Sequence, residues 1–310
     1  MLPRIFVSIA NYRDSEAPHT IADVFEKAAF PERITVGVLD QIMPSDQNYS
    51  IDHSLFAGQV RRVVVDARES KGVCWARHRI LTELRQDEDF VLQVDSHSRF
   101  SSNWDLRFIK MLKACPSPKS ILTTYPVGYE PLDYLCPPCI PVMTGYKYQA
   151  PAILLFHTRT ISMKDAPSSP IPGAFFGGSC VFAPSRAFDE VPYDPYNYFH
   201  GEEISMAARL WTNGWDIYAP NDVLMYHDYT TNRGRSRNWD DNMEWWPMAN
   251  KSFARVRAVF GLETPIDPTV IENLSSYGLG NARSLSEYEA FADISLSRDH
   301  IGPRALNGSF

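Results

Sequence analysis

The first 115 residues alternate short apolar runs with segments of helical periodicity, and this alternation constrains the fold more than any other feature. The apolar runs are rich in valine, isoleucine and leucine, as in strands that are buried on both faces. We expect strands at residues 4–10, 33–40, 60–67 and 90–95, and helices at residues 20–30, 72–85 and 103–115. Such strands, alternating with helices, form mostly parallel sheets. The sequence therefore predicts an α/β fold in which helices flank a mostly parallel central sheet.

Polar side chains follow the carboxyl ends of the predicted strands, and open α/β sheets bind their ligands at this edge. The clearest case is FVLQVDSHSRF, residues 90–100, in which a buried strand leads directly into Asp95 and His97. Residues two apart on an extended chain point to the same side, so both side chains can reach one divalent cation. A carboxylate with imidazole suits Mn²⁺, Fe²⁺ or Zn²⁺, and Mg²⁺ can bind through the carboxylate. His227 is the best candidate for a third ligand, and the alternative is a capped strand end with His97 at the surface.

An arginine on the second expected helix offers a place for an anion. Arg77 follows Gly72, the first residue of that helix, and we expect it to face the carboxyl edge of the sheet. Helix amides and a guanidinium at this edge could bind a diphosphate. The alternative is a surface salt bridge between Arg77 and Glu69 or Glu83.

Two acids and two glycines in the second half of the chain are further candidates. Glu202 and Glu203 open an expected helix at residues 201–215, directly after an aromatic run. They could act on a bound sugar, or they could simply stabilise the helix dipole. Gly177 and Gly178 precede an expected strand, where they permit close approach of the backbone to a ligand or form a plain turn.

Two segments of the chain are expected to be loops that contribute to function. Residues 230–242 are polar and basic, and Arg233 could close over phosphates in a mobile flap, unless the segment is only a solvated loop. Residues 116–172 are rich in proline and aromatic residues, and long loops inside a compact domain are commonly functional. We expect this second segment to shape an acceptor site.

The chain shows no clear linker, and we predict one domain with insertions. The predicted parts are a catalytic domain at residues 1–250, made of halves 1–115 and 116–250, and a small helical extension at 251–310 packed on it.

Composition narrows the possible partners. The formal net charge of −7 argues against a nucleic-acid partner, which usually demands a basic surface. No apolar run approaches the ~20 residues of a membrane-spanning helix. Five cysteines without a repeated spacing favour a reducing compartment, so we expect a cytoplasmic protein. Cys136 and Cys139 form a lone CxxC in a proline-rich loop, which favours two incidental thiols over a zinc site.

Several segments occur in an order that resembles a known family. They are IFVSIANYRD, CWARHRI, QVDSHSRFSSNWD, FFGGSCVFA, FHGEEISMAARLWTNGWDIYAP, MYHDY and YGLGNARSLSEYEAF. Together they resemble glycosyltransferase family 60, which includes cytoplasmic N-acetylglucosaminyltransferases that act on protein hydroxyproline. A more distant likeness is to the polypeptide N-acetylgalactosaminyltransferases, whose Gly-Gly-Glu-Asn segment before an Arg-x-Trp is similar to residues 201–203 before residues 209–211.

The resemblance implies a GT-A fold and a metal-dependent, retaining transfer of a sugar from a UDP-sugar, UDP-GlcNAc by likeness, to a glycan or protein hydroxyl. It implies that Asp95, His97 and His227 bind Mn²⁺ or Mg²⁺, the first two in a DxD-type motif, and that Glu202, with Glu203 beside it, lies next to the donor sugar. The residues expected to bind the nucleotide sugar are Ser8, Ala10, Tyr12, Arg13, Asp40, Asp66, Gly72, Arg77, Ser96, Gly177, Gly178 and Arg233.

Two alternatives remain open from the sequence. Two histidines and a carboxylate also form the facial triad of non-haem iron oxygenases, although those usually have the order His-x-Asp and an all-β fold. A module that binds sugar nucleotides or glycans without catalysis could also keep the fold. The intact set of Asp95, His97, His227 and Glu202 argues against such a module.

Overall fold

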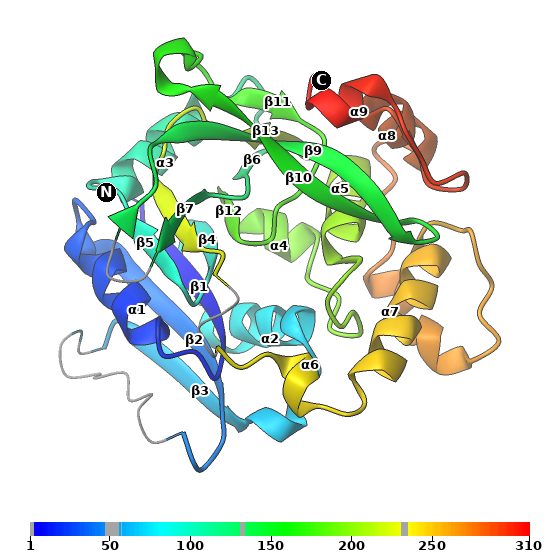
Figure 1. Ribbon diagram of the computed structural model, residues 1–310, viewed down its shortest axis with the longest axis horizontal. Helices are drawn as coiled ribbons and strands as arrows, with labels where there is room; N and C mark the ends of the chain where they lie inside the picture. The colour runs from blue at the N-terminus through cyan, green and yellow to red at the C-terminus, as the bar shows by residue number, and fades with distance from the viewer. Residues whose placement is uncertain (1–2, 47–55, 57, 131–133, 231–234) are drawn as a thin grey trace.

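The computed structural model describes residues 3–46, 56, 58–130, 134–230 and 235–310 (Figure 1). Within them an eight-stranded sheet forms the centre of the molecule, in the order β11-β13-β6-β12-β4-β1-β2-β3. The strands of this sheet are β1 (Ile5–Tyr12), β2 (Ile34–Ile42), β3 (Val60–Asp66), β4 (Phe90–Asp95), β6 (Ser120–Thr123), β11 (Ile171–Gly173), β12 (Cys180–Pro184) and β13 (Asp216–Ala219).

The parallel part of the sheet is the part that the first third of the sequence predicts. β1 pairs in parallel with β2 and with β4, and β2 pairs in parallel with β3. β12 runs antiparallel between β4 and β6, so the sheet as a whole is mixed. Ala10 lies opposite Asp95 across β1 and β4, so the carboxyl ends of these strands are level. The α/β prediction is confirmed.

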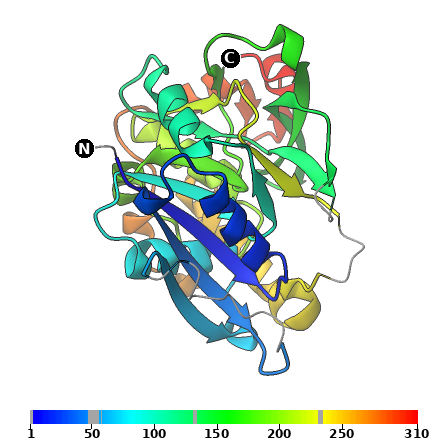
Figure 2. The same cartoon turned by 90° about the vertical axis from the view of Figure 1, so that its left-hand side faces the viewer.

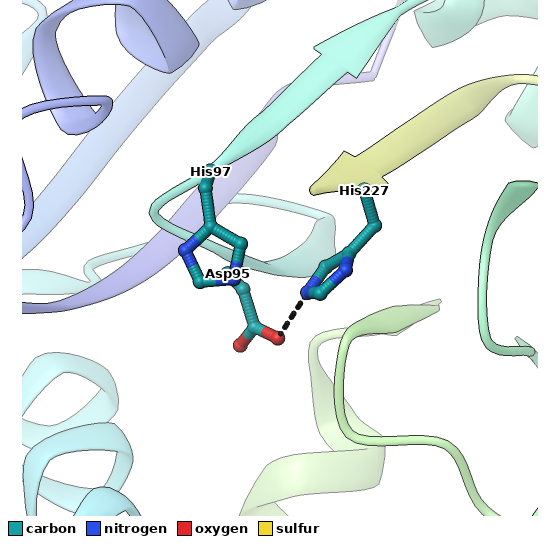
Figure 3. A group of neighbouring side chains, drawn as sticks. All are labelled: Asp95, His97 and His227. Atoms are coloured by element: carbon teal, nitrogen blue, oxygen red, sulfur yellow. Dashed lines mark hydrogen bonds and ion pairs between the residues drawn. The ribbon is translucent and has the colours of Figure 1, made fainter. Parts of the chain in front are cut away.

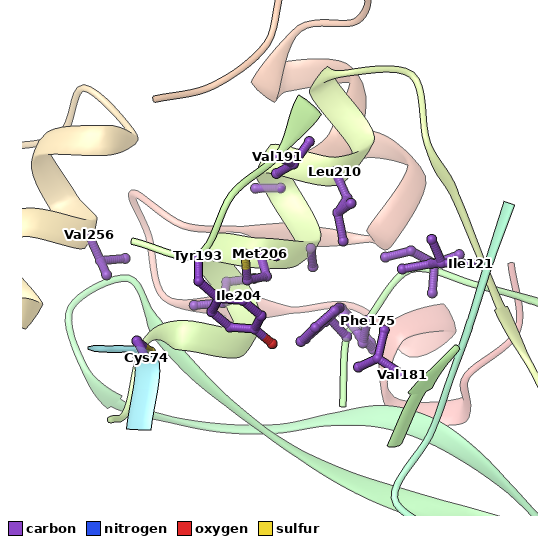
Figure 4. Close-up of a cluster of buried hydrophobic side chains, with 14 of the residues drawn as sticks. Cys74, Ile121, Phe175, Val181, Val191, Tyr193, Ile204, Met206, Leu210 and Val256 are labelled. Carbon is purple, nitrogen blue, oxygen red and sulfur yellow. The ribbon is translucent and has the colours of Figure 1, made fainter. Parts of the chain in front are cut away.

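Helices cover both faces of the sheet because alternate residues of each strand point to opposite sides. Ile5, Val7 and Ile9 of β1 pack in the cluster that includes α1 and α3, whereas Phe6 packs in the cluster of α2 and α5. Figure 2 shows α1 lying across the strands, and Figure 4 shows the second cluster around Ile204. The helices are α1 (Ala17–Glu26), α2 (Val73–Arg79), α3 (Trp104–Lys113), α4 (Arg186–Glu190), α5 (Glu202–Thr212), α6 (Asn238–Asp241), α7 (Trp245–Val259), α8 (Leu285–Ala292) and α9 (Pro303–Asn307).

Shorter helical segments complete the picture. α2 continues as a π-helical turn, Ile80–Leu84. Single 3₁₀ turns are formed by Pro31–Arg33, Ala67–Glu69, Met163–Asp165, Pro268–Ile271 and Leu274–Ser276.

The proline-rich middle segment is not the long loop that its composition suggests. It forms a long antiparallel hairpin of β9 (Cys139–Ala150) and β10 (Ile153–Ser162), which crosses the upper part of the molecule in Figure 1. It also supplies β7 (Val127–Glu130) and β8 (Tyr134–Leu135) to a small sheet in the order β5-β14-β7-β8. The other members are β5 (Ser98–Phe100) and β14 (Met225–Asp228). This small sheet places two histidine-bearing segments side by side.

The last sixty residues pack onto the rest of the chain. Tyr288 of α8 is fully buried, and its hydroxyl donates to the carbonyl of Ala174 at 3.1 Å. α9 lies against β9, and β15 (Ile294–Ser295) pairs with β16 (His300–Ile301). α7 runs across residue 250, and the division into a catalytic domain and an extension stays a prediction. None of the described helices combines the length and the hydropathy needed to cross a bilayer.

Candidate active site

Three side chains, from two strands and a turn, meet at the carboxyl edge of the sheet. Asp95 ends β4, His97 lies in the turn before β5, and His227 lies in β14, paired with Ser98 of β5. One ligand atom from each of Asp95, His97 and His227 lies within 4.8 Å of the others (Figure 3). His227 Nε2 is 3.0 Å from Asp95 Oδ2, and the two imidazole rings are 4.6 Å apart. The structure brings these three predicted residues together, and their role as metal ligands stays a prediction.

A fourth residue, Asp14, orients the ring of His97 in this cluster. Asp14 is buried, and its Oδ2 lies 2.7 Å from His97 Nδ1 and accepts a hydrogen bond from Ser96 Oγ at 2.9 Å. A proton on Nδ1 directed at the carboxylate leaves the Nε2 lone pair for a ligand. Burial alone would raise the pKa of Asp14, but the hydrogen bond with His97 holds that pKa below its usual value. Tyr12 and Arg13 at this strand end were predicted as site residues, whereas Asp14 was not.

The charge states in the cluster suit a cation. Burial and the neighbouring His97 lower the pKa of His227, so its imidazole is neutral near pH 7, which is the form that binds metals. Burial opposes ionisation of Asp95, but the hydrogen bond with His227 and the charge of Arg77 hold its pKa well below the usual range. The cluster therefore offers an ionised carboxylate at Asp95 and a neutral imidazole at His227, with the imidazole of His97 beside them.

Arg77 joins this cluster to the acids of α5. Its guanidinium is buried, and Nη2 donates to Asp95 Oδ1 and to the carbonyl of Gly178, both at 2.9 Å. Nη1 donates to Glu202, and the two side chains form a buried ion pair. The surface salt bridge considered for Arg77 is made instead by Arg79, whose Nη2 donates to Glu83 at 2.8 Å. Arg77 thus holds one oxygen of Asp95 while His227 lies against the other.

The two glycines before β12 make room for this arrangement. A Cβ at Gly178 would lie 2.8 Å from Arg77 Nη1 and 3.2 Å from Glu202 Oε1. A Cβ at Gly177 would lie 2.9 Å from the carbonyl carbon of Thr124. At Gly178, glycine therefore leaves room for the ion pair of Arg77 and Glu202.

Glu203 differs from its neighbour in environment. Its Oε1 accepts from the backbone N–H of Gly178 at 2.9 Å, and its Oε2 accepts from the hydroxyl of Tyr125. Burial raises the pKa of Glu203 to about 7, although both hydrogen bonds oppose the shift. Neither acid of α5 serves as a helix cap, because Glu202 pairs with Arg77 and Glu203 with these two donors.

These residues line a cavity of about 360 Å³, named here the central cavity. Its polar lining includes Arg77, Asp95, His227, Glu202 and Glu203. The β9–β10 hairpin closes it with apolar side chains, and Tyr125, Tyr229 and Phe199 add aromatic rings. The hairpin residues were not among the predicted site residues, because nothing in their local sequence indicates which cavity they face.

Comparison with known proteins agrees with this geometry. A family model described as Glycosyltransferase (GlcNAc) matches residues 4–52 and 46–298, which together are most of the chain. The chain belongs to this glycosyltransferase family. It is therefore an enzyme of glycosyl transfer, and the family resemblance drawn from the sequence motifs is confirmed.

Solved structures support the fold of this glycosyltransferase. A crystal structure of GalNAc-T7 with UDP, GalNAc and Mn²⁺ is similar with a TM-score of 0.61 at 12% identity, over 94% of this chain and 57% of that one. The chain thus spans little more than half the length of that protein. A crystal structure of S. aureus TarS has a TM-score of 0.50 at 12% identity, over 88% of this chain and 70% of that one. Both likenesses bear on the fold alone, and the predicted GT-A fold is confirmed. No curated protein sequence matches the chain.

Only some of the residues predicted to bind the nucleotide lie near the cluster of Asp95, His97 and His227. Ala10 is the neighbour of Asp95 across the sheet, and Gly72 is the N-cap of α2 with φ +100°. A Cβ at Gly72 would lie 2.2 Å from the carbonyl oxygen of Tyr198, so this position requires glycine. Ser8 is fully buried in the middle of β1, away from the strand end.

The remaining predicted residues have partners within the protein. Arg13 bridges Asp46 at 2.8 Å and Asp241 at 2.7 Å, and the hydroxyl of Tyr12 also donates to Asp241. The buried Asp40 pairs with Arg62 and accepts from Asn11 at 2.7 Å, and Asp66 pairs with Arg68. Arg233 lies outside the described residues. Arg235, in the same basic segment, has Nη1 3.8 Å from Asp228 and 4.0 Å from Asp14, close to the histidine cluster.

The raised pKa of Glu203 gives a prediction for stability. Because the folded pKa of about 7 exceeds the ordinary 4.5, the folded state retains a proton in that window. The stabilisation is fully present below pH 4.5 and is lost as pH rises to about 7. We expect the free energy of unfolding of Glu203→Gln to decline less across this window than that of the wild type. Urea unfolding at several pH values measures the difference. Glu244→Gln, at an exposed glutamate, is the control, and equal pH slopes for wild type and Glu203→Gln would refute the prediction.

Proposed function

We propose that this glycosyltransferase transfers N-acetylglucosamine from UDP-GlcNAc to a hydroxyl of a glycan or protein acceptor, with retention and with a divalent cation, Mn²⁺ or Mg²⁺. The observation that carries the proposal is the convergence of Asp95, His97 and His227. Asp95 and His227 of this cluster line a cavity together with Arg77 and the acids of α5. The description of the matching family supports N-acetylglucosamine. The structurally similar GalNAc-T7, crystallised with UDP, GalNAc and Mn²⁺, supports the uridine nucleotide and the metal.

The donor atoms fit a divalent cation. A hard carboxylate oxygen with two borderline imidazole nitrogens is a donor set that suits Mn²⁺, and Asp14 fixes the ring of His97 as a partner of a metal ligand should. A bound cation would act as a Lewis acid toward the diphosphate leaving group. Arg77 would keep Asp95 in place, and Arg235, with Nη1 4.0 Å from Asp14, would add positive charge beside the cluster.

The orienting role of Asp14 gives a test of the site. We expect Asp14→Asn to weaken binding of Mn²⁺ by about 10- to 100-fold, because removal of a carboxylate behind a ligating histidine has this effect. Calorimetric titration of the apo protein with Mn²⁺ measures it. Asp87→Asn removes an exposed carboxylate elsewhere and should bind as the wild type does. Equal affinities for wild type and Asp14→Asn would contradict the assignment.

The environment of the acids supports retention without a covalent intermediate. Glu202 is held in an ion pair with Arg77, and both oxygens of Glu203 accept hydrogen bonds while its pKa is raised to about 7. Neither is a free carboxylate poised to attack the anomeric carbon. We propose a front-face reaction in which the bond from the anomeric carbon to UDP breaks and a bond to the acceptor oxygen forms on the same face. The acceptor proton passes to the departing phosphate oxygen.

A second cavity gives a path for the acceptor. It has a volume of about 440 Å³ and shares Tyr125, Phe156 and Tyr229 with the central cavity. The described residues that line it include Pro141 and Thr158 and carry no acidic or basic side chain other than a histidine. Most of the lining comes from the proline-rich middle segment, which supports the proposal that this segment shapes a site for an uncharged acceptor.

The proposal is tested by a donor screen. The protein is incubated with a panel of UDP-sugars and other nucleotide sugars, with Mn²⁺ or with EDTA, and release of free nucleotide is followed. We expect hydrolysis or transfer from UDP-GlcNAc in Mn²⁺ and none in EDTA. Turnover of a different nucleotide sugar would correct the donor, and neither turnover nor binding of any UDP-sugar would overturn the proposal. The cytoplasmic location expected from the cysteines remains a prediction.

A further inference from the structure

A third cavity, of about 240 Å³, adjoins the central cavity and shares Phe199 and His200 with it. The β9–β10 hairpin connects all three cavities. Gln149, near the tip of the hairpin, lines the third, Leu154 lines the central one, and Thr158 lines the second. Along the hairpin, the third cavity therefore lies on one side of the central cavity and the second cavity on the other. The third cavity is named here the aromatic subsite.

The walls of the aromatic subsite are unusually rich in tryptophan. Trp239, Trp245 and Trp246 line it, three of the seven tryptophans of the chain. The rings of Phe199 and Trp239 lie 5.3 Å apart, as do those of Trp245 and Trp246. Trp246 is 52% exposed, so a large aromatic face is open to an incoming ligand. About half of Trp246 remains in contact with solvent, so the packing of the described residues does not bury this ring fully.

Polar groups stand among these rings, and they carry no net charge. Gln149 and Tyr198 lie in the lining, and the Tyr198 hydroxyl donates to Asn238 Oδ1 at 2.5 Å. Burial lowers the pKa of His200, which keeps that ring neutral at physiological pH. No acidic or basic side chain other than this histidine lines the subsite among the described residues. The guanidinium of Arg237 lies over Trp239, 5.8 Å from the ring centre, but Arg237 is outside the lining. A pyranose, which has apolar C–H faces and a polar rim, matches aromatic walls with a few polar groups.

We propose that the aromatic subsite binds a neutral sugar unit of the acceptor, so that the acceptor is an oligosaccharide or carries one. The position of the reacting hydroxyl in the central cavity rests on the proposed function. The subsite itself rests on its own lining and on its continuity with the central cavity. A single sugar ring fills a space of this size, with the remainder of the acceptor leading along the hairpin toward Leu154.

Binding without donor or metal tests the subsite separately from catalysis. Calorimetry and saturation-transfer NMR are run in EDTA with cellobiose, lactose and chitobiose. We expect at least one disaccharide to bind with millimolar affinity, and Trp246→Ala to weaken it by about tenfold. Tyr146→Ala removes a similarly exposed ring, 48% exposed, on β9 outside the three cavities and should bind as the wild type does. Trp239→Ala is the second variant, in case Trp246→Ala alters folding, which thermal unfolding would reveal.

Three outcomes overturn the proposal. In the first, no disaccharide binds. In the second, the tryptophan variants bind the disaccharide as tightly as Tyr146→Ala does. In the third, the tryptophan substitutions weaken binding only of an uncharged proline-containing peptide and not of any disaccharide. A kinetic experiment adds a second arm. With a saccharide acceptor, Trp246→Ala should raise KM for the acceptor about tenfold while metal-dependent donor hydrolysis is unchanged. If no nucleotide sugar is turned over, the proposed function fails and the binding experiment in EDTA still decides the subsite.

Discussion

His227→Ala is expected to reduce metal-dependent glycosyl transfer by more than about 100-fold, because in the proposed site it removes one of three metal ligands and not a residue that only orients a ligand. His227 Nε2 lies 3.0 Å from Asp95 Oδ2, and the ligand atoms of His227 and His97 lie within 4.8 Å of each other. Neither neighbour can replace the nitrogen that the substitution removes. Steady-state kinetics over a range of Mn²⁺ concentrations measures the loss. We expect part of it to be recovered at high Mn²⁺, since weaker binding and not absent binding is the cause.

The control for this variant is another histidine. His300→Ala, at an exposed position on β16, should leave both activity and affinity for Mn²⁺ unchanged. Because His227 is buried, its loss leaves a small gap, and thermal unfolding shows whether the fold persists. Full activity in a folded His227→Ala protein would remove His227 from the metal site and leave Asp95 and His97 without the third ligand that the geometry assigns.

The contrast between Asp95 and Asp14 shows how far the sequence could lead. Asp95 and His97 could be predicted as a pair, because a two-residue spacing on an extended chain fixes their common side. The partner of His97 is eighty-three positions away, and its contact depends on how α1 packs across the sheet. Asp14 could have been suspected only from its place two residues after the end of β1.

The β9–β10 hairpin shows a different limit. Its prolines and aromatic residues favour a loop when considered locally, yet each strand pairs along most of its length. Pairing between strands is a long-range property, and strand propensity depends on the face and edge that a residue occupies. The role of the hairpin in lining three cavities could therefore not be predicted, whereas the helix bearing Arg77 and the acids of α5 could be.

Arg77 could be predicted as a site residue, but its partners could not. These partners are the reason that substitution of Arg77 is expected to have the second large effect, a loss of stability. The guanidinium and Glu202 are both about 5% exposed, and the same guanidinium donates to Asp95. Arg77→Met removes the charge while keeping much of the volume, which leaves two carboxylates near each other without compensation. We expect the free energy of unfolding to fall by about 3–5 kcal/mol, the usual cost of breaking a buried ion pair on one side. Urea unfolding measures it.

A double variant separates stability from catalysis at this position. Arg77→Met with Glu202→Gln removes the charge on both sides of the pair, so we expect most of the lost stability to return. Activity should not return, since Asp95 has still lost the group that holds its Oδ1. Arg79→Met, which breaks an exposed pair with Glu83 on the same helix, should change the free energy of unfolding by less than about 1 kcal/mol. If Arg77→Met unfolds as the wild type does, the ion pair is not what orders this edge of the sheet. Recovery of transfer in the double variant would show that Arg77 serves only the fold, because the cluster of Asp95, His97 and His227 would then be competent without it.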